Sequence, residues 1–167
     1  MNVRALDAAD GRAWHRLLVD GAETCPSAFL MSASEARAMR EERIAAVLAE
    51  GAQWGVFDGE TLVGFLALHR GRLERLRHRA MIGPFYVSAR GGGFGQRLFD
   101  GVMDHAAEDG IDWIDLWVAA TNRGAQRFYA RNGFSVVATR PDAVRMDGVS
   151  EADILMTRRL EADGQGD

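Results

Sequence analysis

The sequence predicts an α/β domain of the α+β kind, with a mixed, mostly antiparallel sheet of about seven strands flanked by about four helices. Short strands come as hairpins early in the chain and alternate with helices later, a pattern typical of mixed sheets. A chain of 167 residues, 47% hydrophobic and 26% charged, suffices for one packed core and leaves little room for another. We therefore expect a single domain over residues 1–160 and a polar, disordered tail over residues 161–167.

Each element in the first half of the chain has a local signal. A short strand opens the chain, and Asp10 is placed to cap the helix that follows, which ends where Pro26 breaks it. The next helix is rich in Ala, Glu and Arg and stops at Gly51. Asp58-Gly59 is a hairpin turn signal between two strands. The predicted elements are residues 2–6, 10–24, 34–50, 53–57 and 61–69.

The second half alternates strands with helices. A polar stretch over residues 70–79 comes first, and we interpret it as a solvated connection, with attraction of an acidic substrate as the alternative. The strand over residues 111–118 has few polar side chains, so we expect both its faces to be covered. The predicted elements are residues 81–87, 94–109, 111–118, 123–131, 134–139 and 153–159. The arginines of the polar stretch are Arg70, Arg72, Arg75, Arg77 and Arg79.

Composition excludes several classes of protein. The formal net charge of −4 argues against a nucleic-acid binder, which normally carries a basic surface. Cys25 is the only cysteine, so no intrachain disulfide can form and a reducing compartment is expected. The sequence shows neither a signal peptide nor an apolar run long enough to span a membrane. We expect a cytoplasmic protein that binds no metal.

The most informative segment is the turn over residues 87–96, which lies between a predicted strand and an amphipathic helix. Gly91, Gly92 and Gly93 permit positive φ and remove the β-carbons that would hold an anion away. The N–H groups of the first helical turn point toward the same place. A phosphate cradle is therefore one interpretation, and a glycine-rich turn without ligand is the other. Neither the Walker loop nor the G-x-G-x-x-G fingerprint fits this segment.

Two motifs in order resemble the GNAT acetyltransferases. Arg90-Gly91-Gly92-Gly93-Phe94-Gly95 is similar to the family's Gln/Arg-x-x-Gly-x-Gly/Ala signature for acetyl-CoA. The segment from Asn122 to Phe134 is similar to its Asn-x-x-Ala-x-x-Phe/Leu-Tyr-x-x-x-Gly-Phe segment. One departure is that only Ser88 and Ala89 separate Val87 from Arg90, where the family usually has about four residues.

The resemblance implies an N-acetyltransferase that moves an acetyl group from acetyl-CoA to a primary amine of a small molecule or peptide, by direct attack in a ternary complex. The alternative is a catalytically silent acyl-CoA-binding regulatory module. Whether the protein forms a homodimer stays open. Tyr129 would be the general acid for the leaving thiolate, although its spacing from Ala125 and Phe128 also suits simple ring packing. The implied cofactor-binding residues are Phe85, Tyr86, Val87, Arg90, Gly91, Gly92, Gly93, Phe94, Gly95, Gln96, Asn122, Ala125 and Phe128.

The acceptor and the general base are less clear in the sequence. His69, Glu74 and Asp115 are candidate bases, and a water chain is the alternative. Burial of Asp115 in an apolar strand would raise its pKa, but structural pairing or exposure to solvent suits this residue equally. The resemblance implies that residues 22–34, which include Phe29 and Met31, and residues 141–152 form the acceptor pocket. The acidic and basic side chains of the second region leave the charge of the acceptor undecided. Trp113 and Trp117, which alternate along one strand, are interpreted as core residues.

Overall fold

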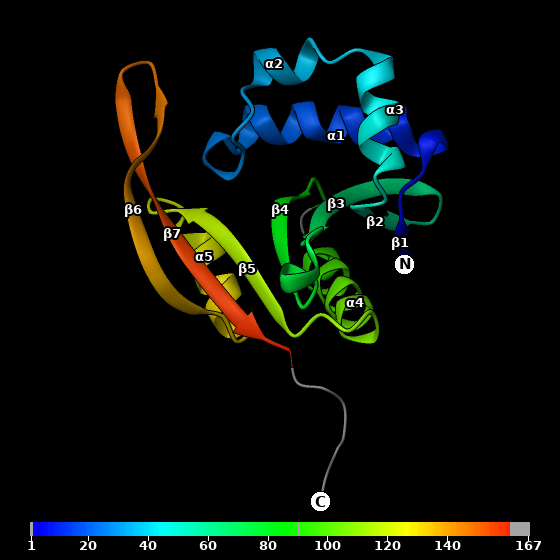
Figure 1. Cartoon of the computed structure of the whole chain (residues 1–167). Helices are drawn as coiled ribbons and strands as arrows, with labels where there is room; N and C mark the ends of the chain where they lie inside the picture. The colour runs from blue at the N-terminus through cyan, green and yellow to red at the C-terminus, as the bar shows by residue number, and fades with distance from the viewer. Residues whose placement is uncertain (1, 90, 161–167) are drawn as a thin grey trace, which may run out of the picture. The chain divides into compact units, whose positions relative to one another are not determined.

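The computed structural model describes residues 2–89 and 91–160. Figure 1 labels the elements along the chain. The strands are β1 (Asn2–Ala5), β2 (Gln53–Asp58), β3 (Thr61–Arg70), β4 (Arg79–Val87), β5 (Trp113–Ala119), β6 (Ser135–Met146) and β7 (Val149–Arg159). The helices are α1 (Gly11–Thr24), α2 (Ala33–Arg37), α3 (Glu41–Ala49), α4 (Phe94–Glu108) and α5 (Arg123–Arg131), with short 3-10 turns η1 (Ala8–Asp10), η2 (Pro26–Ala28) and η3 (Glu74–Leu76).

The strands form one seven-stranded sheet in the order β1-β2-β3-β4-β5-β7-β6. β4 and β5 run parallel, whereas the pairs β1–β2, β2–β3, β5–β7 and β6–β7 are antiparallel. The predicted mixed, mostly antiparallel sheet is confirmed.

Two compact units divide the chain. Residues 1–68 and 83–102 form the first, and residues 69–82 and 103–167 form the second. β4 and α4 each contribute residues to both units. The single domain expected over residues 1–160 stays a prediction, and the expected tail at residues 161–167 lies outside the described residues.

The first unit has its core between α1 and the strands β2 and β3. Trp14, Leu17 and Leu18 of α1 recur at helical spacing and are buried. They pack with Phe57 and Phe65 of the strands in one apolar cluster. The rings of Trp14 and Phe65 meet edge to face with centroids 5.9 Å apart. This face of α1 explains why the amphipathic pattern was a sound predictor of the helix.

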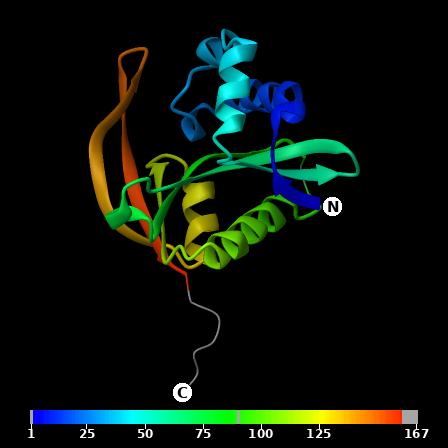
Figure 2. The same cartoon turned by 45° about the vertical axis from the view of Figure 1, so that its right-hand side comes forward.

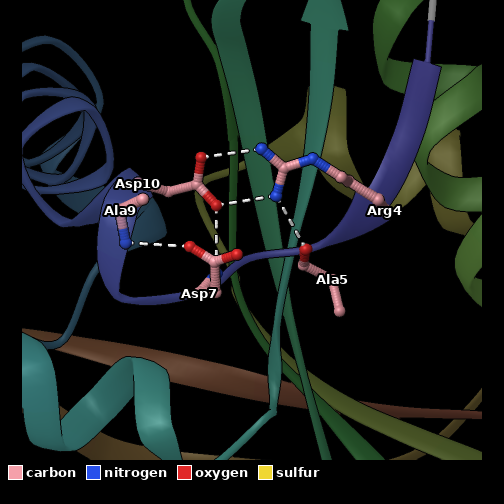
Figure 3. Close-up of polar contacts among 5 residues, drawn as sticks. All are labelled: Arg4, Ala5, Asp7, Ala9 and Asp10. Carbon is pink, nitrogen blue, oxygen red and sulfur yellow. Dashed lines mark hydrogen bonds and ion pairs between the residues drawn. The ribbon is translucent and has the colours of Figure 1, made fainter.

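An ion pair ties β1 to the start of α1 (Figure 3). Arg4 donates from Nη1 and Nη2 to the two carboxylate oxygens of Asp10, at 2.7 and 2.8 Å. Asp10 also accepts from the backbone N–H of Asp7, whose own side chain caps η1 by accepting from Ala9. Asp10 is the N-cap residue of α1, as predicted, but its side chain makes no capping hydrogen bond to that helix. Its hydrogen bonds with Arg4 hold the pKa of Asp10 below its ordinary value.

The helix predicted over residues 34–50 is broken into α2 and α3, so that prediction is wrong. Ser32 begins α2 with a capping box that includes Glu35, and Arg40 is extended with φ −82° and ψ 157°. Glu41 and Glu42 lie in the first turn of α3, where acidic side chains favour a helix start. Ala36 of α2 and Ile44 of α3 are both buried in the core of the first unit.

The second unit contains β5, α5 and a hairpin of β6 and β7. The two strands of the hairpin run side by side in Figures 1 and 2. The hairpin is longer than predicted, because residues 141–152 are mostly strand rather than loop. Asp147 and Gly148 have φ of 49° and 77°, the left-handed pair that a tight Asp-Gly hairpin turn requires. Val144, Met146 and Val149 alternate around that turn, so the sequence carried a signal for the hairpin.

Within residues 2–89 and 91–160, none of the helices has the length and apolarity needed to cross a bilayer.

Candidate active site

The glycine turn of the first unit has the geometry that an anion cradle needs. Gly91, Gly92 and Gly93 have φ of 80°, 66° and 70°, a backbone that side-chain-bearing residues rarely adopt. A β-carbon at Gly91 or Gly93 would meet no atom within 4 Å, so the space beside both residues is open. The positive φ expected from the sequence is confirmed. Arg90 lies outside the described residues.

The turn leads directly into α4. Arg97 donates its backbone N–H to the carbonyl of Gly93 at 3.0 Å, which closes the first turn of the helix. The N–H groups that precede it have no partner inside a helix, and the helix dipole adds positive potential there. No acidic side chain occurs in residues 87–99. The Gln96 side chain donates to Asp100 at 2.8 Å, along the helix. The helix start therefore favours a negatively charged ligand.

The last residues of β4 adjoin this helix start. The β-carbon position of Gly95 lies 3.9 Å from the Phe85 ring and from Val87. Ser88 donates its backbone N–H to Val63 of β3 at 2.9 Å. Because peptide groups alternate direction along a strand, those of Phe85 and Val87 point away from β3. The structure thus brings Phe85, Val87 and the start of α4 together within the first unit.

The Tyr86 side chain points toward α1. Its hydroxyl donates to Asp20 at 2.6 Å and lies 3.2 Å from the Thr24 hydroxyl. Burial and the bond to Asp20 raise the pKa of Tyr86. The ring also meets Phe29 edge to face, with centroids 6.1 Å apart. Only the backbone of Tyr86 was expected to have a role, so this contact between β4 and the region of Phe29 was not predicted.

In the second unit, α5 holds Asn122, Ala125, Phe128 and Tyr129. The Asn122 side chain accepts from the Ala125 backbone N–H at 3.1 Å, so the capping role expected for Asn122 is observed. Gln126 donates from Nε2 to the carbonyls of Ala119 and Ala120, at 2.9 and 3.0 Å. These bonds fix α5 to the end of β5. Sequence reasoning missed Gln126, because nothing in the helical pattern marks a side chain that bonds back to the preceding strand.

Tyr129 is a buried residue of α5, with 7% of its surface exposed. Its ring packs against Phe128 and Phe134, with centroids 5.6 Å away in each case. Burial raises the pKa of Tyr129 well above the ordinary value of a phenol. The hydroxyl therefore keeps its proton throughout the neutral range and acts as a donor.

The candidate bases differ in their surroundings. His69 and Glu74 are exposed. Asp115 accepts from Arg79 at 2.6 and 2.9 Å and from the Thr157 hydroxyl at 2.7 Å. Burial alone would raise the pKa of Asp115, but these hydrogen bonds outweigh it and the pKa is lowered. Of the alternatives for Asp115, structural pairing with Arg79 is observed and a raised pKa is not.

The arginine-rich connection is mostly solvated, as expected, with residues 72–78 exposed. Arg79 pairs with Asp115, and Arg70 pairs with Asp109 at 3.2 Å. Within the described residues, no group of His, Cys, Asp and Glu is placed to hold a metal ion.

The regions expected to form the acceptor pocket lie in different units. Phe29 and Met31 are half-buried and pack against the core cluster of the first unit. The β6–β7 hairpin borders a pocket of about 380 Å³ in the second unit. Its lining residues are Ala120, Thr121, Val144, Met146, Val149, Ser150, Glu151 and Ala152. Trp113 and Trp117 are half-buried rather than core residues, and the guanidinium groups of Arg79 and Arg140 lie over their rings.

Comparison with known proteins places the chain among acetyltransferases. The model of the acetyltransferase (GNAT) family matches residues 14–134. A ribosomal-protein-alanine N-acetyltransferase from Brucella melitensis has a similar fold, with TM-score 0.83, 18% identity, and coverage of 96% of this chain and 100% of the other. A putative acetyltransferase from Salmonella typhimurium, solved with its cofactor acetyl-CoA, has TM-score 0.82, 16% identity and coverage of 100% and 98%. A phosphinothricin acetyltransferase from Sinorhizobium meliloti, solved with acetyl-CoA, has TM-score 0.81, 16% identity and coverage of 95% and 88%. No curated protein sequence matches.

Proposed function

This chain belongs to the acetyltransferase (GNAT) family, and we propose that it moves an acetyl group from acetyl-CoA to a primary amine of a small molecule or peptide. The amine attacks the thioester carbonyl directly in a ternary complex. The observation that carries the proposal is the run of three glycines with positive φ at the start of α4. Acetyl-CoA was bound in two of the similar structures.

The turn and the first turn of α4 would hold the diphosphate of the cofactor. Open space beside Gly91 and Gly93 lets phosphate oxygens approach the backbone closely. The N–H groups of Phe94, Gly95 and Gln96 then supply donors, and the helix dipole supplies positive potential. Arg90 would add a formal charge at the edge. The small residue Gly95 keeps the helix start close to Phe85 and Val87.

Acetyl-CoA, when bound, supplies an activated acetyl thioester. The peptide groups of β4 that point away from β3 suit the amide-rich pantetheine arm, because an extended backbone edge pairs with amides as it would with another strand. A backbone N–H near Phe85 or Val87 would donate to the oxygen on which negative charge develops during attack. Ala125 and Phe128 would line the cofactor side of α5, and Asn122 both caps the helix and offers its amide.

Tyr129 is the proposed donor to the leaving sulfur. In the reaction the N–C bond forms, the C–S bond breaks, the sulfur takes the electron pair, and the amine loses a proton. A phenol titrates near 10 and a thiol near 8.5, and burial raises the pKa of Tyr129 further. Complete proton transfer to the thiolate is therefore unfavourable. A hydrogen bond that strengthens as charge grows on sulfur is the role that this environment supports. We propose that water takes the proton from the amine.

Isothermal titration calorimetry with acetyl-CoA tests the proposal, with dephospho-CoA, ATP and NAD as controls. We expect selective binding that the change Gly93→Glu abolishes, because it strains the turn and puts a carboxylate in the cradle. Gly59→Glu is the matched control, since Gly59 also has positive φ and open space but lies in the β2–β3 turn. Absence of acetyl-CoA binding would refute the proposal. Binding without acetylation of any amine would favour the silent regulatory module.

A further inference from the structure

Trp117, Arg140 and Asp153 lie on one face of the sheet in the second unit. The register pairs Asp153 with Ala119 of β5 and with Arg140 of β6. Paired residues and alternate residues of neighbouring strands share a face, which places Trp117 on the same side. The contacts agree, because the Arg140 guanidinium lies over the Trp117 ring, 4.3 Å from its centroid, and reaches Asp153.

Asp153 is a buried carboxylate with a weakly held partner. Its side chain is 8% exposed, whereas that of Arg140 is 51% exposed. Within the described residues, one hydrogen bond reaches the Asp153 side chain, from Arg140 Nη2 at 3.3 Å. Burial of a carboxylate at this depth is costly without a paired cation. The cation that Asp153 has is the end of a half-exposed side chain, so another cation could take its place.

In the same unit, Asp115 is a second aspartate paired with an arginine, and its partner is held by more hydrogen bonds. Asp115 receives two bonds from Arg79, at 2.6 and 2.9 Å, and a third from Thr157. The Arg79 side chain is also less exposed than that of Arg140, at 34%. Both carboxylate oxygens of Asp115 thus accept hydrogen bonds, whereas the carboxylate of Asp153 can accept further hydrogen bonds from another donor.

Space for a ligand body lies next to this pair. Glu151 shares a strand face with Asp153 and lines the pocket of about 380 Å³ beside the hairpin. Its carboxylate accepts a hydrogen bond from the Thr121 hydroxyl. Val144, Met146 and Val149 supply apolar lining. A carboxylate and an indole face beside an apolar pocket suit a molecule with a cationic end and an aliphatic body.

We propose that Trp117 and Asp153 form a subsite for a cationic group of the acceptor, which Arg140 occupies until the acceptor displaces it. The reacting amine must be neutral to attack, so the bound cation is a second group on the same molecule. The acceptors are therefore amines that carry a further guanidinium or ammonium group. This inference rests on the proposed function for its reaction, but the subsite itself can be tested without acetyl-CoA.

The first experiment measures cation binding. Ethylguanidinium is titrated into the Arg140→Ala variant while tryptophan fluorescence is followed, with neutral ethylurea as the isosteric control. We expect a saturable change, at least about tenfold tighter than in the wild-type protein, because the competing arginine is gone. The response should vanish in Trp117→Phe and weaken in the double variant Arg140→Ala/Asp153→Asn. Equal responses to ethylurea, or no loss in the double variant, would overturn the subsite.

The second experiment measures acetylation of 4-aminobutylguanidine and n-pentylamine, which differ in the second cation. Asp153→Asn should lower kcat/KM for the first amine at least about tenfold and leave the second unchanged, and Arg140→Ala should raise it for the first. Asp115→Asn should affect both amines alike, and Arg145→Ala neither. If the wild-type protein acetylates both amines equally, or binds acetyl-CoA but acetylates neither, the assignment of the subsite to the acceptor is overturned. Loss of acetyl-CoA binding would instead refute the proposed function.

Discussion

Replacing Gly21 by alanine sets two opposite effects against each other. Alanine in the interior of α1 should stabilise the helix by about 1 kcal/mol relative to glycine. However, the added β-carbon would lie 2.7 Å from Phe29 Cε2 and 2.9 Å from Tyr86 Cγ. Overpacking of this kind costs about 1–3 kcal/mol. Because two rings that contact each other must both shift, we take the upper end, so that the net loss is about 2 kcal/mol.

Thermal unfolding followed by circular dichroism measures this loss. For a chain of this size, about 1 kcal/mol corresponds to about 2–4 °C in Tm, so Gly21→Ala should lower Tm by about 4–8 °C. Gly124→Ala is the matched control, because the nearest atom to its added β-carbon is the Asn122 side-chain oxygen at 3.8 Å. That variant should be as stable as the wild type or more so. A Gly21→Ala protein with unchanged or higher Tm would show that helix propensity outweighs the packing of Phe29 and Tyr86.

Three further changes test individual residues. Tyr129→Phe should lower kcat about 100-fold or more while the Kd for acetyl-CoA stays unchanged. Because the pKa of Tyr129 is raised, the wild-type protein should lose no activity through ionisation of this residue up to pH 10. A loss of wild-type activity at alkaline pH that the variant does not show would contradict this. Asp115→Asn should cost about 2 kcal/mol at pH 7 in urea unfolding, because it weakens charged bonds to Arg79. The pKa of Asp115 is lowered by folding, so its contribution is complete above the ordinary carboxyl pKa and is lost as pH falls through the folded value; the cost should therefore shrink below about pH 4. Asp10→Ala should cost about 2 kcal/mol, and a double change with Arg4→Ala should cost less than the sum of the single changes, whereas additivity would show that the pair contributes nothing.

Local patterns predicted most of the fold, because the elements carry their own signals. The glycines before α4 predicted positive φ directly, and the apolar face of α1 predicted a core helix. The break between α2 and α3 could not be predicted from composition, because Ala, Glu and Arg favour a helix throughout. The pair Glu41-Glu42, which favours a helix start, was the local sign of the second helix. The extended β6–β7 hairpin was signalled by Asp147-Gly148, a turn pair that lies inside the connection predicted over residues 141–152.

The candidate site was less predictable, because its contacts join residues distant in sequence. The sequence left Asp115 open between a candidate base and a structural partner, because its pairing with Arg79 depends on the parallel register of β4 and β5. Likewise, the bond from Tyr86 to Asp20 spans 66 positions. Sequence spacing predicts which residues share a face within one element, but it does not predict which elements become neighbours in the fold.

The ends of the sheet bear on how the protein behaves when concentrated. The strand order leaves β1 and β6 at the two edges, and an edge strand is a template on which other chains can aggregate. β1 has only four residues. β6 is long and exposes Val136 and Val137, but Pro141 has no N–H to donate and the register shifts between Arg140 and Val144. Pro141 and the shifted register therefore interrupt the edge of β6, so that an added strand cannot pair along its whole length.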